Sequence, residues 1–120
     1  MRAQIFRGLL VACFLGLSGT SSVALAEDVR MFIRHNVADY GVWKKGYDSY
    51  APTQKKMGVF SQAVYQSTDN PNDITVIHDF HSVEKAKAFA ASPDLKTAME
   101  KLGVTGEPQI WYVTKRKRTK

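Results

Sequence analysis

The sequence predicts an α+β fold, in which helices cover one face of a four-stranded antiparallel sheet. Apolar and polar residues alternate from Val29 to Val37, which is the period of a strand. Tyr40, Trp43, Tyr47 and Tyr50 follow at intervals of three or four, which is the period of an amphipathic helix. Two strands joined by a hairpin, a second helical region and a last strand complete the order βαββαβ, the ferredoxin-like arrangement.

Capping and turn-forming residues set the boundaries of these elements. Asp39 is expected to be the N-cap of the first helix, which Pro52 ends or bends, and a further turn or an irregular stretch then leads to Gly58. Ser82 caps the second helix, and the pair Ser92-Pro93 starts a further one. The other expected elements are strands at 59–66, 74–81 and 109–114, a turn at 69–73 and a helix stop at Gly103.

Several strands carry apolar residues at both parities, so both faces of the sheet are expected to be apolar. The residues available for the face without helices are Phe32, Ile77 or Val76, and Trp111 or Ile110. The simplest cover for that face is the same face of a second copy. We therefore expect a homodimer, which makes the fold a dimeric α/β barrel.

Residues 1–26 have the three parts of a secretory signal peptide. Arg2 and Arg7 supply positive charge, Gly8 to Leu17 is an apolar run, and Ala24-Leu25-Ala26 is a small-x-small cleavage site. Cleavage near Ala26 predicts a periplasmic or secreted protein.

A membrane anchor and lipidation at Cys13 are the alternatives to a cleaved signal. The apolar run from Gly8 to Leu17 is short of the ~20 residues needed to span a bilayer, and it continues past Cys13 instead of ending there. Removing 26 of the 120 residues leaves 94, which is enough for one domain at 27–114. Cys13 is the only cysteine, so this domain has no disulfide.

The formal net charge of +6 is concentrated at the two ends of the chain. Arg2, Arg7 and five residues of a basic tail at 115–120 together carry seven positive charges, so residues 27–114 have a net charge of −1. Nucleic acid is not an expected partner, because the chain is expected to be exported. The tail is either a solvated end or a contact to an anionic membrane surface. Its charged residues are Lys115, Arg116, Lys117, Arg118 and Lys120.

A series of short motifs runs through nearly the whole of the domain. They are His35-Asn36-Val37 with Asp39-Tyr40 and Trp43, Gly58-Val59, Val64-Tyr65, the turn Asp69-Asn70-Pro71-Asn72, Phe80, Ala86 with Phe89, Ser92-Pro93-x-Leu95-Lys96-x-Ala98-Met99, and Gly103-Val104-x-Gly106-x-Pro108. In these motifs the chain resembles the small dimeric α/β-barrel proteins of the antibiotic biosynthesis monooxygenase-like superfamily, which include exported, cyclase-like members.

The resemblance implies the fold and the homodimer but no single activity. The superfamily includes oxygenases, haem-degrading enzymes, isomerases, cyclases and non-catalytic members, and fold does not imply function. In members that oxidise quinol-like substrates without a cofactor, buried Tyr, Trp and Asn side chains orient the substrate. The candidates for that role here are Asn36, Tyr40, Trp43 and Trp111. The residue set of the haem-degrading branch is not reproduced, and we expect no cofactor.

His35 and His78 are the candidate catalytic residues, because they lie in strands that are neighbours in this fold. An imidazole in an apolar cleft can act as a general base near neutral pH or bind haem iron. The alternative is a structural histidine that is hydrogen-bonded at a strand end. The strand register decides whether His35 and His78 share a face.

Metal sites are not expected. His78 and His81 are three residues apart in a strand and point to opposite faces. Asp69 and Asp73 flank a turn that explains them better than a calcium loop does.

The aromatic stripe from Tyr40 to Tyr50 faces the sheet, where it either forms core or lines a pocket for a flat apolar ligand. Trp43 is the pocket residue we favour. The sequence therefore predicts an exported homodimer that binds a small apolar or aromatic molecule. The alternatives are a cofactor-independent monooxygenase or isomerase/cyclase acting on an aromatic substrate, and an envelope-surface protein that uses its basic tail.

Overall fold

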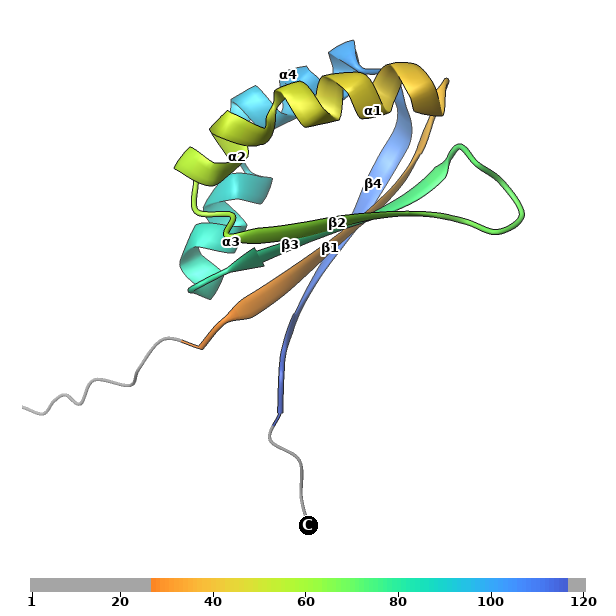
Figure 1. Cartoon of the computed structure of the whole chain (residues 1–120). Coiled ribbons are helices and arrows are strands. Elements are labelled where there is room, and N and C mark those ends of the chain that lie inside the picture. Colours follow the sequence, from red (N-terminus) through yellow and green to blue (C-terminus); the bar gives the residue numbers. More distant parts are fainter. Residues whose placement is uncertain (1–26, 117–120) are drawn as a thin grey trace, which may run out of the picture.

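Four helices cover one face of a four-stranded antiparallel sheet with the strand order β2-β3-β1-β4, as Figure 1 shows. The elements are β1 (Val29–Val37), α1 (Tyr40–Ser49), α2 (Ala51–Lys56), β2 (Ser61–Gln66), β3 (Asp73–Phe80), α3 (Val83–Ala90), α4 (Pro93–Lys101) and β4 (Val104–Thr114). This is the predicted α+β, ferredoxin-like βαββαβ order, with each helical region divided in two.

The computed structural model describes residues 27–116. The predicted signal peptide at 1–26 and the tail residues 117–120 lie outside the described residues. Within 27–116, no helix is long and apolar enough to cross a membrane.

The pleat of the central strands β1 and β3 divides their side chains between the two faces of the sheet. β1 pairs with β3 in an antiparallel register that sets Met31 opposite His78 and His35 opposite Ile74. These four side chains are buried beneath the helices. Phe89 on α3 is also fully buried and belongs to the same core between the helices and the sheet.

The opposite face of the sheet carries an aromatic stack between two ion pairs. Phe32 and Trp111 are paired across β1 and β4, and their rings stack with centroids 5.1 Å apart and planes inclined by 8°. On either side of Phe32, arginines make two-bond contacts to aspartates of β3. The two pairs are Arg30 with Asp79 and Arg34 with Asp73. This face is therefore apolar in its middle and neutral in charge.

The helical region after β1 differs from the expectation for residues 51–57. The Asp39 side chain accepts a hydrogen bond from the Val42 N–H, as predicted for an N-cap. A second helix, α2, follows directly at Ala51, where a further turn or an irregular stretch was expected. Pro52 lies in the first turn of α2, where its missing N–H costs no helical hydrogen bond.

The last strand, β4, begins five residues earlier than the sequence predicts. Arg34 pairs with Gln109 and Asn36 pairs with Thr105, so the three residues 106–108 lie opposite His35 alone. This is a bulge, and Gly106 adopts a φ of 74° in it. Proline is accepted at bulges of edge strands because no ladder hydrogen bond is required there, which explains why the strand continues through residue 108.

Helices α1 and α4 meet at a glycine. A Cβ atom at Gly46 would lie 2.1 Å from Cδ2 of Leu102, which directly follows α4. Only a residue without a side chain therefore lets α1 approach Leu102 at this point.

Replacing Gly46 with alanine tests this close approach. Although alanine is the better helix former, we expect Gly46→Ala to lower the free energy of unfolding by about 1 to 2 kcal/mol, because the overpacking outweighs the gain in propensity. Urea denaturation measures the change. In a Leu102→Ala background the same substitution is expected to stabilise. Gly41→Ala, where the nearest atom would be 3.4 Å away, is the matched control on the same helix. A loss at Gly46 that persists without the Leu102 side chain would contradict the proposed contact.

Candidate functional site

A small cavity lies between the sheet and helices α1, α2 and α4. Its volume is about 30 Å³, which is enough for a water molecule. The aromatic and polar residues that line it are His35, Trp43, Tyr47, Tyr50, Gln54 and His78, and the apolar ones are Ile33, Val76, Leu95, Ala98, Met99 and Leu102. Both candidate catalytic histidines therefore border the same cavity.

An aromatic row on α1 connects the two histidines. The His35 and Trp43 rings are 5.6 Å apart in an edge-to-face arrangement, and Trp43 stacks on Tyr47 with a centroid distance of 4.8 Å. Tyr47 in turn stacks on His78 at 5.9 Å. Trp43 and Tyr47 are four residues apart on α1, which places them on one helix face above the sheet.

Tyr47 fixes the tautomer of His78 through its hydroxyl group. The hydroxyl donates to Oε1 of Gln62 on β2, and its oxygen lies 2.8 Å from Nε2 of His78. With the Gln62 amide oxygen facing the hydroxyl, the hydroxyl hydrogen is directed to Gln62, and the His78 ring is assigned as the donor of its Nε2–H to the phenol oxygen. Nδ1 of His78 is then left as an unprotonated acceptor.

Four residues that line the cavity each contain a buried polar atom without a hydrogen-bond partner among residues 27–116. These atoms are Nδ1 of His35, the hydroxyl of Tyr50, Oε1 of Gln54 and Nδ1 of His78. The exposed fraction is only 2% for Gln54 and for His78. Such groups are rare in folded proteins, where nearly every buried polar atom is paired. Their grouping around one cavity marks it as the candidate site.

Burial keeps both histidines neutral at physiological pH. Desolvation lowers the pKa of His78 to about 4, opposed by the nearby Asp79 carboxylate. Desolvation also lowers the pKa of His35. It raises the pKa of the Tyr47 and Tyr50 phenols, which therefore remain protonated. The site thus offers neutral hydrogen-bonding groups, and no charge, to whatever enters it.

The structure brings together some of the predicted site residues and separates others. His35, His78 and Trp43 share the helix-covered face. Tyr40 is half-buried at the start of α1, where its N–H donates to the Asn72 side chain and its ring lies 6.1 Å from Trp43. It does not line the cavity.

Asn36 and Trp111 lie on the opposite face of the sheet. Asn36 is exposed and immediately follows His35, so the pleat turns its side chain away from the cavity. Trp111 is 42% exposed and stacks on Phe32 on that outer face.

Gln54 is the site residue that the sequence reasoning did not identify. It lies on α2, in the stretch for which the sequence predicts a further turn or an irregular segment. Its spacing was a usable signal, because it follows Tyr47 by seven residues and Tyr50 by four, the repeat of one helical face.

His81, Asp69 and Asp73, for which the sequence predicts no metal site, do not line the cavity. Nδ1 of His81 is 2.9 Å from a carboxylate oxygen of Asp28, on the exposed side of the molecule. Asp73 pairs with Arg34, and Asp69 is exposed in the turn after β2. In residues 27–116, no group of three or more His, Cys, Asp or Glu side chains could hold a metal ion.

Solved structures share this fold at low sequence identity. SnoaB, a cofactor-independent oxygenase from Streptomyces nogalater, is 15% identical with a TM-score of 0.64, over 78% of this chain and 97% of SnoaB. The ActVA-Orf6 monooxygenase from Streptomyces coelicolor, solved with nanaomycin D, is 18% identical with a TM-score of 0.55, over 78% and 91%. A conserved protein from Methanosarcina mazei is 19% identical with a TM-score of 0.60, over 75% and 94%.

The fold is therefore the ferredoxin-like α+β fold of antibiotic biosynthesis monooxygenase-like proteins, which confirms the predicted resemblance at the level of structure. No family model and no curated protein sequence matches the chain.

The pKa of His78 predicts how stability changes with pH. The imidazole has an ordinary pKa of 6.5 when the chain is unfolded and about 4 when it is folded, so the unfolded state binds more protons between these values. The free energy of unfolding is therefore expected to fall as the pH is lowered from about 6.5 to about 4, by up to about 3 kcal/mol from this group. His35 contributes with the same sign.

Denaturant titrations between pH 4 and 7 measure this dependence. The slope is expected to flatten in His78→Gln, which cannot titrate there, and to persist in His81→Gln, which changes an exposed histidine. Equal slopes in wild type and His78→Gln would show that the buried imidazole is not responsible.

Proposed function

We propose that this chain binds a small, largely apolar or aromatic molecule in the cavity between its helices and its sheet. The supporting observation is the set of unpaired buried polar atoms around an otherwise apolar cavity. Each such group costs about 1 to 3 kcal/mol when it has no partner. A ligand that supplies hydrogen bonds as well as apolar surface offsets that cost.

The ligand is expected to be a hydrogen-bond donor. Nδ1 of His78 is an acceptor in the tautomer that Tyr47 imposes, and Oε1 of Gln54 is an acceptor by its chemistry. The stacked rings of Trp43 and Tyr47 present flat apolar surface beside these acceptors. An aromatic ring that carries a hydroxyl group matches both features.

Two naphthalene derivatives test this ligand chemistry. 2-Naphthol can donate a hydrogen bond and 2-methoxynaphthalene cannot. We expect calorimetry to show about tenfold tighter binding of 2-naphthol, the value of one net hydrogen bond. Gln54→Met, which removes one acceptor at similar volume, is expected to reduce the preference. Gln66→Met is the matched control, because Gln66 is exposed on β2. Equal affinities for both compounds in the wild type would contradict the proposed role of the acceptors.

Cofactor-independent oxygenation of such a ligand is the second candidate function. The similarity in fold to SnoaB and to ActVA-Orf6 supports it, and so does the presence of two neutral imidazoles at one cavity. A neutral imidazole can take a proton from a substrate O–H or C–H group. A pKa of about 4 makes His78 a weak base, which is why binding is the function proposed first. Oxygen uptake with 1,4-dihydroxynaphthalene, lost in His78→Gln, would favour catalysis over binding alone.

We also propose that the outer face of the sheet joins two copies into a homodimer. The Phe32–Trp111 stack leaves Trp111 42% exposed, and Ile77 of β3 lies on the same face. The flanking Arg30–Asp79 and Arg34–Asp73 pairs satisfy their charges within one chain. The face can therefore meet its own copy without leaving a buried charge unpaired.

Native mass spectrometry of the full-length chain, expressed in a bacterial host, tests this dimer. We expect dimers for the wild type and monomers for Trp111→Glu, because the new carboxylate would be buried without a partner. Val42→Glu is the matched control, since Val42 is 62% exposed on α1 in the helix layer. A monomeric wild type, or dissociation by both variants alike, would contradict the proposed face.

Export is proposed from residues 1–26, and the subunit mass in the same spectrum reports whether cleavage occurs near Ala26.

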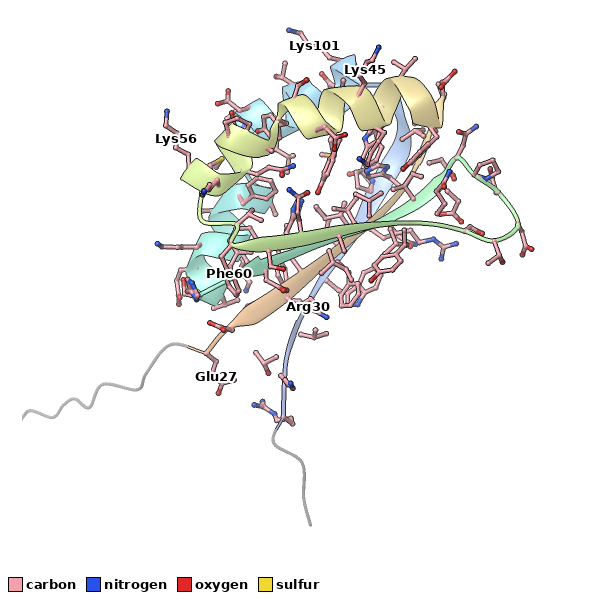
Figure 2. All side chains as sticks on the ribbon, in the orientation of Figure 1. Glu27, Arg30, Lys45, Lys56, Phe60 and Lys101 are labelled. Carbon is pink, nitrogen blue, oxygen red and sulfur yellow. The ribbon has the colours of Figure 1, made fainter. Side chains whose placement is uncertain are left out.

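Lys45, Lys56 and Lys101 project from the outer side of the helix layer, away from the sheet, in Figure 2. Contact of the tail with an anionic surface remains a separate proposal. It rests on residues of which Lys115 and Arg116 are described, and both are exposed.

A further inference from the structure

The cavity is too small for the ligand that its lining suggests. At about 30 Å³ it holds a water molecule, whereas a cavity that binds a single benzene ring has a volume of ~150 Å³. An aromatic ligand therefore enters only if part of the wall moves.

Met99 separates the cavity from a much larger groove. The groove has a volume of about 510 Å³ and lies between α4 and β4. Met99, on α4, lines both the cavity and the groove, and it is half-buried. Methionine has an unbranched side chain with three rotatable bonds, so it changes its position at lower cost than the other residues of the wall.

The bulge of β4 forms the far side of the same groove. Gly106, Glu107 and Pro108 line it, and these three residues lie opposite His35 in the sheet. His35 lines the cavity. The bulge that borders the groove is therefore paired in the sheet with a residue of the cavity, and bulges commonly occur beside functional sites.

The other side of α4 is closed more tightly. There Leu102 packs directly against the backbone of Gly46 on α1, at a distance that excludes even a Cβ atom. The branched leucine side chain has less room to rotate in this contact. The contact between Leu102 and α1 is thus a less favourable entrance to the cavity than Met99.

We propose that Met99 is a movable partition between two compartments of one binding site, and that the groove between α4 and β4 is the outer compartment. This inference rests on the proposed function. The ring of the ligand lies in the inner compartment once Met99 turns aside. Ser92, Lys96, Glu100 and Glu107 line the groove, so the outer compartment takes a polar, hydrogen-bonding substituent. The ligand class is an aromatic molecule with a hydroxyl group at one end and a polar chain at the other.

The accessibility of the Trp43 ring to a small quencher reports how far Met99 closes the cavity, and its measurement needs no ligand. The chain has two tryptophans, so Trp111→Phe leaves Trp43 as the single indole. Trp43 is 2% exposed and lines the inner cavity. Acrylamide quenching of its fluorescence reports how often the cavity is open. In this background we expect Met99→Ala to raise the quenching constant severalfold and Leu102→Ala to raise it less.

Met57→Ala is the matched control, because Met57 packs against the core but lines neither compartment. Circular dichroism verifies that each variant is folded, and Met99→Val replaces Met99→Ala if alanine prevents folding. Quenching in the Met99 variant no greater than in Met57→Ala would overturn the partition. Increased quenching supports it even if no naphthol binds, in which case the proposed function fails and the partition stands.

Ligand length tests the outer compartment. 6-(Hydroxymethyl)-2-naphthol extends 2-naphthol by one polar group on the opposite side of the ring. We expect the longer compound to bind more tightly than 2-naphthol to the wild type, and Glu107→Ala to remove that advantage. Equal affinities of the two compounds for the wild type would overturn the assignment of the groove to a polar chain.

Discussion

The hydrogen bonds of Tyr47 hold the site together. Its hydroxyl group reaches His78 on β3 and Gln62 on β2, so one side chain of α1 is fixed to two neighbouring strands. This contact sets the height of α1 above the sheet, stacks Tyr47 against Trp43, and fixes the tautomer of His78. The cavity lies between the sheet and helices α1, α2 and α4, and Gly46 allows α1 to pack directly against Leu102, which follows α4.

The sequence pattern predicted the layers of the molecule well, because each layer depends on local periodicity. The alternation in β1 placed His35 on the helix-covered face, and the three-to-four spacing on α1 placed Trp43 there too. The register was beyond such reasoning, since it depends on pairing between strands that are distant in the chain. Asn36 and Trp111 were grouped with Trp43 because of the family resemblance. The alternation of β1 already sets Asn36 on the face opposite His35, and Trp111 lies on that outer face as well.

Gln54 shows a second limit of reasoning from the sequence. Pro52 was expected to end or bend the first helix, and a proline is also compatible with the first turn of a new helix. Recognition of α2 would have added Gln54 to the aromatic stripe. The resemblance of the fold to SnoaB and ActVA-Orf6 does not supply such residues either, because at 15% and 18% identity it concerns the path of the backbone. The chemistry of the site has to be argued from its own side chains.

The bulge of β4 also affects how this chain behaves in a crowded solution. β4 is an edge strand, and an unprotected edge offers a row of backbone groups to which a strand of another molecule can add. At residues 106–108 that row is interrupted by a positive φ at Gly106 and by Pro108, which has no N–H to donate. The edge of β4 is therefore interrupted at these three residues, and a strand of another molecule cannot pair with it continuously from Val104 to Thr114.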